Sequence, residues 1–329
     1  MNQKMNRQIN RETKHVIVTG GAGFIGSHLC DALLKQGFAV TAIDNLVTGR
    51  METISEAQKN SKFFFLKQDV CLTLNDKDIP FISQYGLAGV LHFACPASPV
   101  DFDRIPFEIL AVDSIGTMNT ADLALRHQSR YLLASTSEVY GDPLVHPQTE
   151  DYFGNVNPIG PRACYDETKR FGEAYVSTAI RFKKLNAGIV RIFNTYGPRM
   201  RLDDGRIVPE LCRQAMAGEP LSIHGDGLQT RSFCYVSDLV EGILRLFQSS
   251  EHGPINIGNP VERTVLDFAE VVRKLSKSRS PIEHSPGRVD DPKRRCPDIS
   301  RAKRLLGWSP QVDLEEGLQL SLDYFRTQV

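Results

Sequence analysis

The sequence predicts an α/β fold, in which a doubly wound parallel sheet is joined to a smaller, partly discontinuous C-terminal lobe. Short apolar runs alternate with longer helical patterns through residues 14–194. This order is typical of a parallel sheet covered by helices on both faces. A glycine-rich turn joins the first apolar run to the first helical pattern. After residue 194, turns containing Gly and Pro interrupt the pattern, which indicates a less regular lobe.

The elements follow from these runs in chain order. The β-branched run HVIVT at 15–19 is expected to be a buried strand, and 24–35 a helix. Further apolar runs predict strands at 39–43, 63–66, 90–93, 131–135 and 187–193. Longer patterns predict helices at 107–127, 161–184, 207–217 and 236–247. We therefore expect a nucleotide-binding domain over 14–194, to which a strand near 254–259 returns, and a second lobe over 195–329.

Composition excludes several classes of protein. The 329 residues are 41% hydrophobic and 24% charged, with 39 basic and 39 acidic side chains. A balanced net charge gives no global field for nucleic acid or an anionic membrane. The chain has no apolar run of about 18 residues, and residues 1–14 lack the apolar core of a signal peptide. Seven scattered cysteines without metal-ligand spacing predict free thiols, no bound metal and a cytoplasmic location.

Glycines recur at Gly20, Gly23 and Gly26, between the first strand and the first helix. Such glycines allow a tight turn and let backbone N–H groups approach a pyrophosphate at the helix N-terminus, where Phe24 and Ile25 lie. An ordinary strand–helix turn is the alternative. The position of this turn after a strand and before a helix favours a Rossmann-type dinucleotide site.

Asp44 ends the second predicted strand, 24 residues after Gly20. An acid at this place accepts hydrogen bonds from the adenosine ribose and disfavours a 2′-phosphate, so we expect NAD rather than NADP. Arg50 is the opposing observation, because a nearby arginine accommodates a 2′-phosphate. Asn45 and the pair Asp69–Val70 are expected on the adenosine side, although Asp69 is as well explained as a strand-end cap.

Tyr165 and Lys169 lie four residues apart in a predicted helix and therefore share one face. A free tyrosine has a pKa of about 10, and a close ammonium lowers it. The pair is thus a plausible device for proton transfer to or from an alcohol. The alternative is a surface helix pair. The preceding strand, 131–135, ends in Thr136, Ser137 and Glu138, which favours the catalytic interpretation.

The pattern Gly20-x-x-Gly23-x-x-Gly26, together with Thr136 and Tyr165-x-x-x-Lys169, resembles the extended short-chain dehydrogenase/reductases. Longer segments, including HFACPASP, STSEVYGDP, RIFNTYGPRM and DDPKRRCPDI, resemble the UDP-glucuronate decarboxylases, also called UDP-xylose synthases. The resemblance implies NAD-dependent decarboxylation of UDP-glucuronate to UDP-xylose through a 4-keto intermediate, with NAD regenerated in the site. It implies six catalytic residues: Thr136, Ser137, Glu138, Tyr165, Lys169 and Arg295.

Two other functions are weighed against this one. Sugar-nucleotide 4,6-dehydratases carry Thr-Asp-Glu at the strand end, and their aspartate protonates a departing hydroxyl. Ser137 takes that position here, which argues against a dehydratase, and the HFACPASP segment argues against a 4-epimerase. A protein of a different class, a catalytically silent dinucleotide sensor or RNA-associated scaffold, is also weighed, and the intact Thr136, Tyr165 and Lys169 and the neutral net charge argue against it.

The resemblance also implies how UDP-glucuronate is bound. Asn194, Arg231 and Arg295 are expected at the diphosphate, because arginine suits phosphate geometry. Gln229 and Tyr235 are expected at the uridine. The full set of expected substrate contacts is Pro99, Glu138, Tyr165, Asn194, Arg199, Val208, Gln229, Arg231, Tyr235 and Arg295. The alternative for residues 293–295 is a basic run exposed to solvent. Arg162 is equally well explained as a substrate contact or as a loop cap. The family further implies a homodimer through 107–127 and 161–184.

Overall fold

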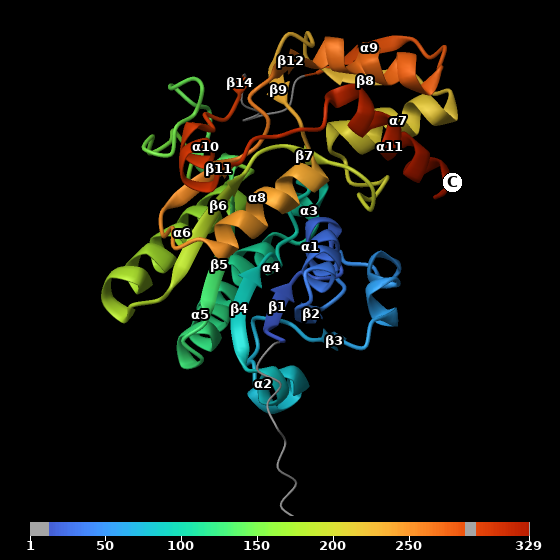
Figure 1. Cartoon of the computed structure of the whole chain (residues 1–329). Helices are drawn as coiled ribbons and strands as arrows, with labels where there is room; N and C mark the ends of the chain where they lie inside the picture. Colours follow the sequence, from blue (N-terminus) through green and yellow to red (C-terminus); the bar gives the residue numbers. More distant parts are fainter. Residues whose placement is uncertain (1–12, 287–293, 329) are drawn as a thin grey trace, which may run out of the picture.

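The computed structural model describes residues 13–286 and 294–328. Its centre is a seven-stranded parallel sheet with strand order β11-β6-β5-β4-β1-β2-β3 (Figure 1). The strands are β1 (His15–Thr19), β2 (Ala39–Asp44), β3 (Phe63–Lys67), β4 (Leu87–His92), β5 (Arg130–Thr136), β6 (Ala187–Ile192) and β11 (Pro254–Ile257). The order of connections reverses between β1 and β4. In such sheets ligands bind at that switch point, beyond the carboxyl ends of the strands.

Alternating side chains on each strand divide the core into two layers. Val16 and Val18 of β1 pack on one face, with helices α1 (Phe24–Lys35) and α8 (Val236–Gln248). Ile17 points to the other face. That face is covered by α2 (Pro80–Tyr85), α5 (Thr117–Arg126) and α6 (Ala163–Lys183). Both faces of the sheet are buried, which explains why its strands are apolar throughout rather than alternating.

The expected helix over 107–127 is interrupted. The structure has α4 (Pro106–Ala111), then η4 (Val112–Gly116), which is a π-helical turn, and then α5. The π-turn places Asp113, a buried acid, against α6. Single π-turns within helices occur frequently at functional sites. The helix expected over 161–184 begins two residues later, at Ala163.

The second lobe gathers above the carboxyl end of the sheet (Figure 1). Its helices are α7 (Ile207–Ala217), α9 (Val265–Ser276), α10 (Ser300–Leu306) and α11 (Leu314–Arg326). Its strands are β7 (Thr195–Tyr196), β8 (Leu221–His224), β9 (Thr230–Ser232), β10 (Cys234–Tyr235), β12 (Glu262–Thr264), β13 (Ile282–Ser285) and β14 (Arg294–Arg295). The chain crosses between lobe and sheet several times, because α8 and β11 return to the sheet after β10.

Short elements complete the connections. They are α3 (Pro99–Arg104) and the 3₁₀ turns η1 (Met51–Ile54), η2 (Ala57–Lys59), η3 (Asp76–Asp78) and η5 (Ser137–Tyr140). Turn η5 follows β5 directly, and its start is capped by the Thr136 side chain, which accepts a hydrogen bond from the Glu138 N–H. Over residues 13–286 and 294–328, none of the helices has the length and apolar character needed to span a bilayer.

Candidate active site

One cleft runs along the carboxyl end of the sheet and beneath the second lobe. Both parts of the chain contribute to its walls. Among the lining residues are Gly20, Gly23, Asp44, Asp69, Thr136, Glu138, Tyr165, Lys169, Asn194, Gln229, Arg231 and Arg295. The structure therefore brings most of the side chains expected at the cofactor and the substrate into a single site.

The glycine turn has the shape that a dinucleotide needs. Gly20 has φ +67°, and a Cβ there would lie 2.6 Å from the Phe93 carbonyl oxygen. A Cβ on Gly26 would lie 2.0 Å from the Gly20 oxygen, so only glycine lets α1 approach the turn this closely. Gly23 caps α1 in extended conformation and brings no side chain to the first turn. Phe24 and Ile25 follow it on the cleft wall. The site therefore fits a pyrophosphate at the N-terminus of α1.

Asp44 is held beside this turn. Its Oδ2 accepts the Ala22 N–H at 3.0 Å, and its Oδ1 accepts the Leu46 N–H at 2.8 Å. Burial raises the pKa of the Asp44 carboxyl, while these two backbone hydrogen bonds oppose the rise. Arg50 lines the same part of the cleft and donates to the Arg199 carbonyl at 3.4 Å. A fixed carboxylate at this place suits a ribose diol better than a phosphate.

Asp44→Asn is expected to lower the preference for NAD over NADP by about tenfold, because one charged hydrogen-bond acceptor for the ribose is lost and the repulsion of a 2′-phosphate disappears. Titration with each dinucleotide measures the two dissociation constants. Asp122→Asn, an exposed change on α5, is the control. An unchanged ratio of the two constants would show that Asp44 does not contact the ribose.

The adenosine side of the cleft contains the other expected residues. Asn45 Nδ2 donates to Asp69 Oδ2 at 3.3 Å. Asp69 Oδ1 also accepts the Cys71 N–H at 2.8 Å, so Asp69 caps the turn after β3 while lining the cleft. Val70 is buried beside it. Both interpretations of Asp69, a turn cap and a wall of the adenosine pocket, therefore fit its position.

Thr136, Tyr165 and Lys169 meet where β5 ends against α6. The Tyr165 hydroxyl is hydrogen-bonded to the Thr136 side chain. Lys169 Nζ donates to the Ala134 carbonyl at 3.0 Å and lies 5.6 Å from the centre of the Tyr165 ring. The Tyr165 ring also stacks on Phe102, with ring centres 5.1 Å apart. These contacts fix the phenol and the ammonium side by side in a buried site.

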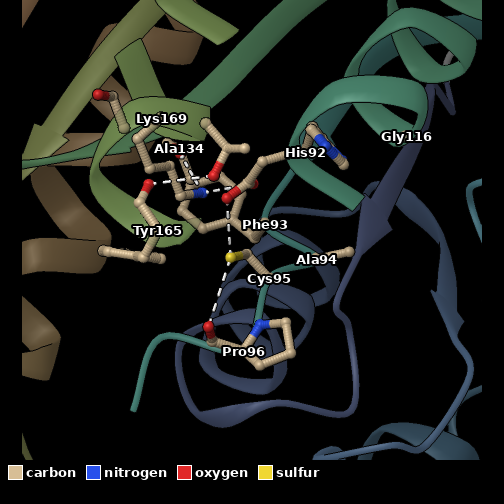
Figure 2. A network of polar contacts seen from close by, with 12 residues as sticks. His92, Phe93, Ala94, Cys95, Pro96, Gly116, Ala134, Tyr165 and Lys169 are labelled. Atoms are coloured by element: carbon tan, nitrogen blue, oxygen red, sulfur yellow. Dashed lines mark hydrogen bonds and ion pairs between the residues drawn. The ribbon is translucent and has the colours of Figure 1, made fainter. Parts of the chain in front are cut away.

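Lys169 has a further partner that the sequence analysis missed. Its Nζ lies 2.9 Å from Asp113 Oδ1, and the Cys95 thiol donates to Asp113 Oδ2 at 3.0 Å. Figure 2 shows the side chains of Cys95, Tyr165 and Lys169 near one another. Asp113 is only 2% exposed. The carboxylate therefore neutralises much of the ammonium charge next to Tyr165.

This arrangement affects the acidity of both catalytic groups. Burial raises the pKa of Tyr165, Lys169 opposes that rise, and Cys95 and Asp113 add to it. For Lys169, burial lowers the pKa, but the Asp113 carboxylate together with Cys95 and Tyr165 outweighs burial, and the net pKa is raised. Asp113 thus keeps Lys169 protonated, and at the same time it weakens the stabilisation of a Tyr165 phenolate.

Asp113→Asn is expected to move both limbs of the pH profile of kcat/KM to lower pH, by about one unit. Without the carboxylate the ammonium stabilises the Tyr165 phenolate more strongly, so the acid limb moves down. Lys169 also loses its proton more easily, so the alkaline limb moves down. Steady-state rates across the pH range measure both limbs. A lower rate without displacement of either limb would contradict this electrostatic role.

Glu138 occupies the centre of a second charged cluster. Arg295 donates to both carboxylate oxygens, with Nη2 at 2.9 Å from Oε2, and Arg162 Nη2 lies 2.8 Å from Oε2. All three side chains are 16% exposed or less. Burial opposes ionisation of Glu138, but Arg295 and Arg162 outweigh burial and lower its pKa to about 2. Glu138 is therefore a carboxylate throughout the physiological range.

The remaining predicted substrate residues separate into two groups. Pro99, Asn194, Val208, Gln229 and Arg231 line the cleft, as does Ser137. Arg199 also lines it, but its Nη2 is held by Asp31 of α1 at 2.6 Å. Tyr235 is different: its ring packs against Tyr196 at 5.6 Å in the core of the second lobe and is not part of the cleft wall. The structure does not bring Tyr235 together with the other predicted contacts.

Two further acids lie near the catalytic residues, and one of them has a signal in the sequence. Asp113 follows Ile109 by four residues and precedes Thr117 by four, so it is an acid on the buried stripe of a helical pattern. Asp166 follows Tyr165, is buried, and lies 3.9 Å from Arg162. Burial and the nearby Glu138 raise its pKa to about 7, against the opposing effect of Arg162. For Asp113 the signal is an acid on the buried stripe of a helix with no residue of opposite charge near it in the sequence. Asp166 shows no such pattern.

Comparison with known proteins adds independent findings. A model of the GDP-mannose 4,6 dehydratase family matches residues 17–320. The chain is 47% identical over 321 residues to UDP-glucuronic acid decarboxylase 2 of Arabidopsis thaliana, covering 98% of this chain and 70% of the relative. It is 46% identical over 325 residues to UDP-glucuronic acid decarboxylase 6 of the same plant, covering 98% and 92%.

A solved structure is similar over the same length. It is UDP-glucuronic acid 4-epimerase from Bacillus cereus, in complex with UDP-glucuronic acid and NAD. The TM-score is 0.86 at 29% identity, and the match covers 96% of this chain and 100% of the epimerase. The arrangement of sheet, lobe and cleft described above is therefore shared with a protein that holds both a dinucleotide and a nucleotide sugar.

Proposed function

The chain belongs to the UDP-glucuronic acid decarboxylases, within the GDP-mannose 4,6 dehydratase family of extended short-chain dehydrogenase/reductases, and on that premise we propose that it converts UDP-glucuronate into UDP-xylose with NAD. Residues 14–194 with β11 would hold the dinucleotide, and 195–329 would hold most of the UDP. Bound NAD supplies a hydride acceptor for sugar carbon 4 and returns the hydride after decarboxylation, so it is regenerated in the site.

The residues of β5 and α6 suit the oxidation of carbon 4. Tyr165 acts as the phenolate, which Lys169 stabilises, and it becomes a neutral phenol when it takes the proton of the carbon 4 hydroxyl. Thr136, hydrogen-bonded to Tyr165, holds the sugar oxygen in line with the phenol. Oxidation makes a β-keto acid, whose carboxylate leaves as carbon dioxide because its electrons flow into the new carbonyl. Tyr165 and Thr136 then donate hydrogen bonds to the enolate oxygen. A proton from solvent must be delivered to carbon 5 of the enolate to restore the carbon 4 ketone before the hydride returns.

The charged cluster suits the loss of the carboxylate. Arg295 and Arg162 are placed to attract the substrate carboxylate, while the Glu138 charge next to them repels it. Neutral carbon dioxide feels no such repulsion, so Glu138 favours the product of this step. Ser137, buried beside them, offers a hydroxyl and no acid. Elimination of water, which needs a proton donor for the departing hydroxyl, is not supported there.

One observation carries the proposal. The same cleft contains Thr136, Tyr165 and Lys169, which suit the oxidation of an alcohol, and also Arg162 and Arg295, which suit the binding of a carboxylate. The Glu138 carboxylate lies between these two arginines. The test is to incubate the protein with UDP-glucuronate and NAD and to follow product mass and NADH absorbance. Loss of carbon dioxide without net NADH supports a decarboxylase that regenerates its cofactor. Unchanged mass with inverted stereochemistry at carbon 4 would indicate an epimerase, and net NADH with a 4-keto pentose would indicate an enzyme that releases its intermediate.

A homodimer through α4 and α6 is part of the proposal. Large apolar side chains on these helices and on η4 are exposed, and they are Phe107, Leu110, Ile115, Phe171 and Phe182. Exposed apolar side chains on adjacent helices favour a helix-to-helix contact between two copies. The mass of the protein in solution tests it.

A cytoplasmic location is supported by the cysteines. All seven are free thiols, as a reducing compartment maintains.

A further inference from the structure

Gln148 is a buried side chain that binds the segment next to Arg295. It is completely inaccessible to solvent. Its side-chain Oε1 accepts the Cys296 N–H at 2.8 Å, and its backbone N–H donates to the Cys296 carbonyl at 2.9 Å. The Gln148 carbonyl accepts the Asp298 N–H at 2.9 Å. One residue thus makes three hydrogen bonds to the chain that immediately follows Arg295.

Arg295 is held from the other side as well. Its strand, β14, pairs with β9, where Arg295 lies opposite Arg231. The backbone of Arg295 therefore lies between a strand of the second lobe and Gln148. Arg295 lines the cleft, where its guanidinium meets Glu138.

Gln148 is itself anchored to the central sheet. Its carbonyl also accepts a hydrogen bond from Asn256 Nδ2 of β11 at 2.9 Å. Asn256 Oδ1 in turn accepts the Tyr140 hydroxyl of η5 at 2.8 Å. Arg191 of β6 donates to the same Tyr140 oxygen at 2.9 Å. The hydrogen bonds of Gln148 therefore connect the Arg295 segment to the rigid strands that also position Glu138.

A separate anchor is needed because the ion pair with Glu138 cannot hold Arg295 at every stage. When a substrate carboxylate enters, it competes with Glu138 for the guanidinium. The backbone contacts of Gln148 involve no charge and are unaffected by that exchange. A displacement of about 1 Å in a positioned group is enough to lower a rate severalfold or more.

We propose that Gln148 is a positioning residue for Arg295, which keeps the guanidinium in place while its partner changes from Glu138 to the substrate carboxylate. This inference rests on the proposed decarboxylase function. It predicts that loss of Gln148 slows the decarboxylation step and leaves oxidation at carbon 4 unaffected, because Tyr165 and Lys169 lie on α6 and make no contact with Gln148.

The test uses the full chain with Gln148→Leu. Gln214→Leu is the matched control, because Gln214 Oε1 accepts the Ser222 N–H at 2.9 Å and is also buried, but in α7. Gln148→Leu is expected to lower kcat about tenfold. Since oxidation continues while decarboxylation is slow, the steady-state fraction of bound NADH should rise above that of the parent. Gln214→Leu should lower thermal stability without raising bound NADH.

Gln148→Glu provides a second variant should the leucine protein fail to fold. The Gln148 amide accepts the Cys296 N–H and donates from Nε2 to the Val145 carbonyl at 3.0 Å. A protonated Glu can keep both contacts, whereas a carboxylate has no proton for the Val145 carbonyl, so this variant should work nearly as well as the parent at low pH and progressively worse as it ionises. A double-mutant cycle with Arg295→Lys completes the test. If Gln148 acts through Arg295, the two effects on kcat are less than multiplicative.

Three results would overturn the assignment of Gln148: a parental fraction of bound NADH in Gln148→Leu, multiplicative effects on kcat in the cycle with Arg295→Lys, or a pH profile of Gln148→Glu parallel to that of the parent.

The parent protein tests the proposed function separately. If the parent releases no carbon dioxide, that function fails, and Gln148 is then assessed by hydrogen exchange at the Cys296 amide and by UDP-glucuronate affinity. Parental values of both in Gln148→Leu would also overturn it.

Discussion

Tyr165→Phe is expected to lower the rate of carbon dioxide release from UDP-glucuronate by about 10³-fold. The substitution removes the only proton acceptor that the structure places between Thr136 and Lys169 among the described residues. Without it, the carbon 4 hydroxyl keeps its proton and no β-keto acid forms. The phenyl ring retains its stacking on Phe102, so the fold should be preserved.

The measurement is release of labelled carbon dioxide, with NADH absorbance in a single turnover as a second signal. Both should disappear together, because oxidation precedes decarboxylation. Tyr175→Phe is the control, since Tyr175 lies on the same helix and stacks on Phe171 outside the cleft. Release of carbon dioxide at the parental rate by Tyr165→Phe would mean that decarboxylation proceeds without oxidation of the sugar, and the proposed function would have to be abandoned.

The central sheet was predictable because its elements are long and uniformly apolar. β1, α1 and α7 have the expected bounds, β11 (Pro254–Ile257) lies within the expected 254–259, and the other strands of the sheet differ by a few residues at their ends. The helix expected over 107–127 was wrong in its continuity, because the π-turn at Val112–Gly116, whose Asp113 pairs with Lys169 of α6, interrupts it. The apolar pattern alone did not locate this turn.

The second lobe was less predictable, for a physical reason. Strands β9, β10, β12 and β14 have two or three residues, too few for any periodicity to emerge. Their pairing joins residues far apart in the chain, as when Arg295 lies opposite Arg231. No local pattern specifies such a contact.

The candidate site shows the same division between local and distant information. Gly20, Gly23 and Gly26 form one local turn, and Tyr165 with Lys169 one helical face, so their spacing and their position after predicted strands could indicate them. The ion pair of Lys169 with Asp113 and the clamp of Gln148 on Cys296 span 56 and 148 residues. Tyr235 is the opposite case. The resemblance predicted this side chain at the substrate, whereas its ring packs in the core of the second lobe.

Glu138→Gln is expected to lower kcat about 100-fold and to lower KM for UDP-glucuronate at the same time. The pKa of Glu138 is about 2, so the parent carries this negative charge at every working pH. Its removal leaves Arg162 and Arg295 with excess positive charge, to which the substrate carboxylate binds more tightly. Tighter binding of the ground state, without equal stabilisation of the departing carbon dioxide, raises the barrier to decarboxylation.

Affinity for the product separates this explanation from a general loss of structure. UDP-xylose has no carboxylate, so its inhibition constant should stay near the parental value in Glu138→Gln. Two buried arginines that lose the Glu138 charge should lower the free energy of unfolding by on the order of 3 kcal/mol. UDP-glucuronate should restore the melting temperature more than UDP-xylose does, because only the former supplies the missing charge. Glu241→Gln, at an exposed ion pair with Arg245 on α8, is the control for loss of a carboxylate. A higher KM for UDP-glucuronate, or equal tightening of both ligands, would show that Glu138 does not act against the substrate carboxylate.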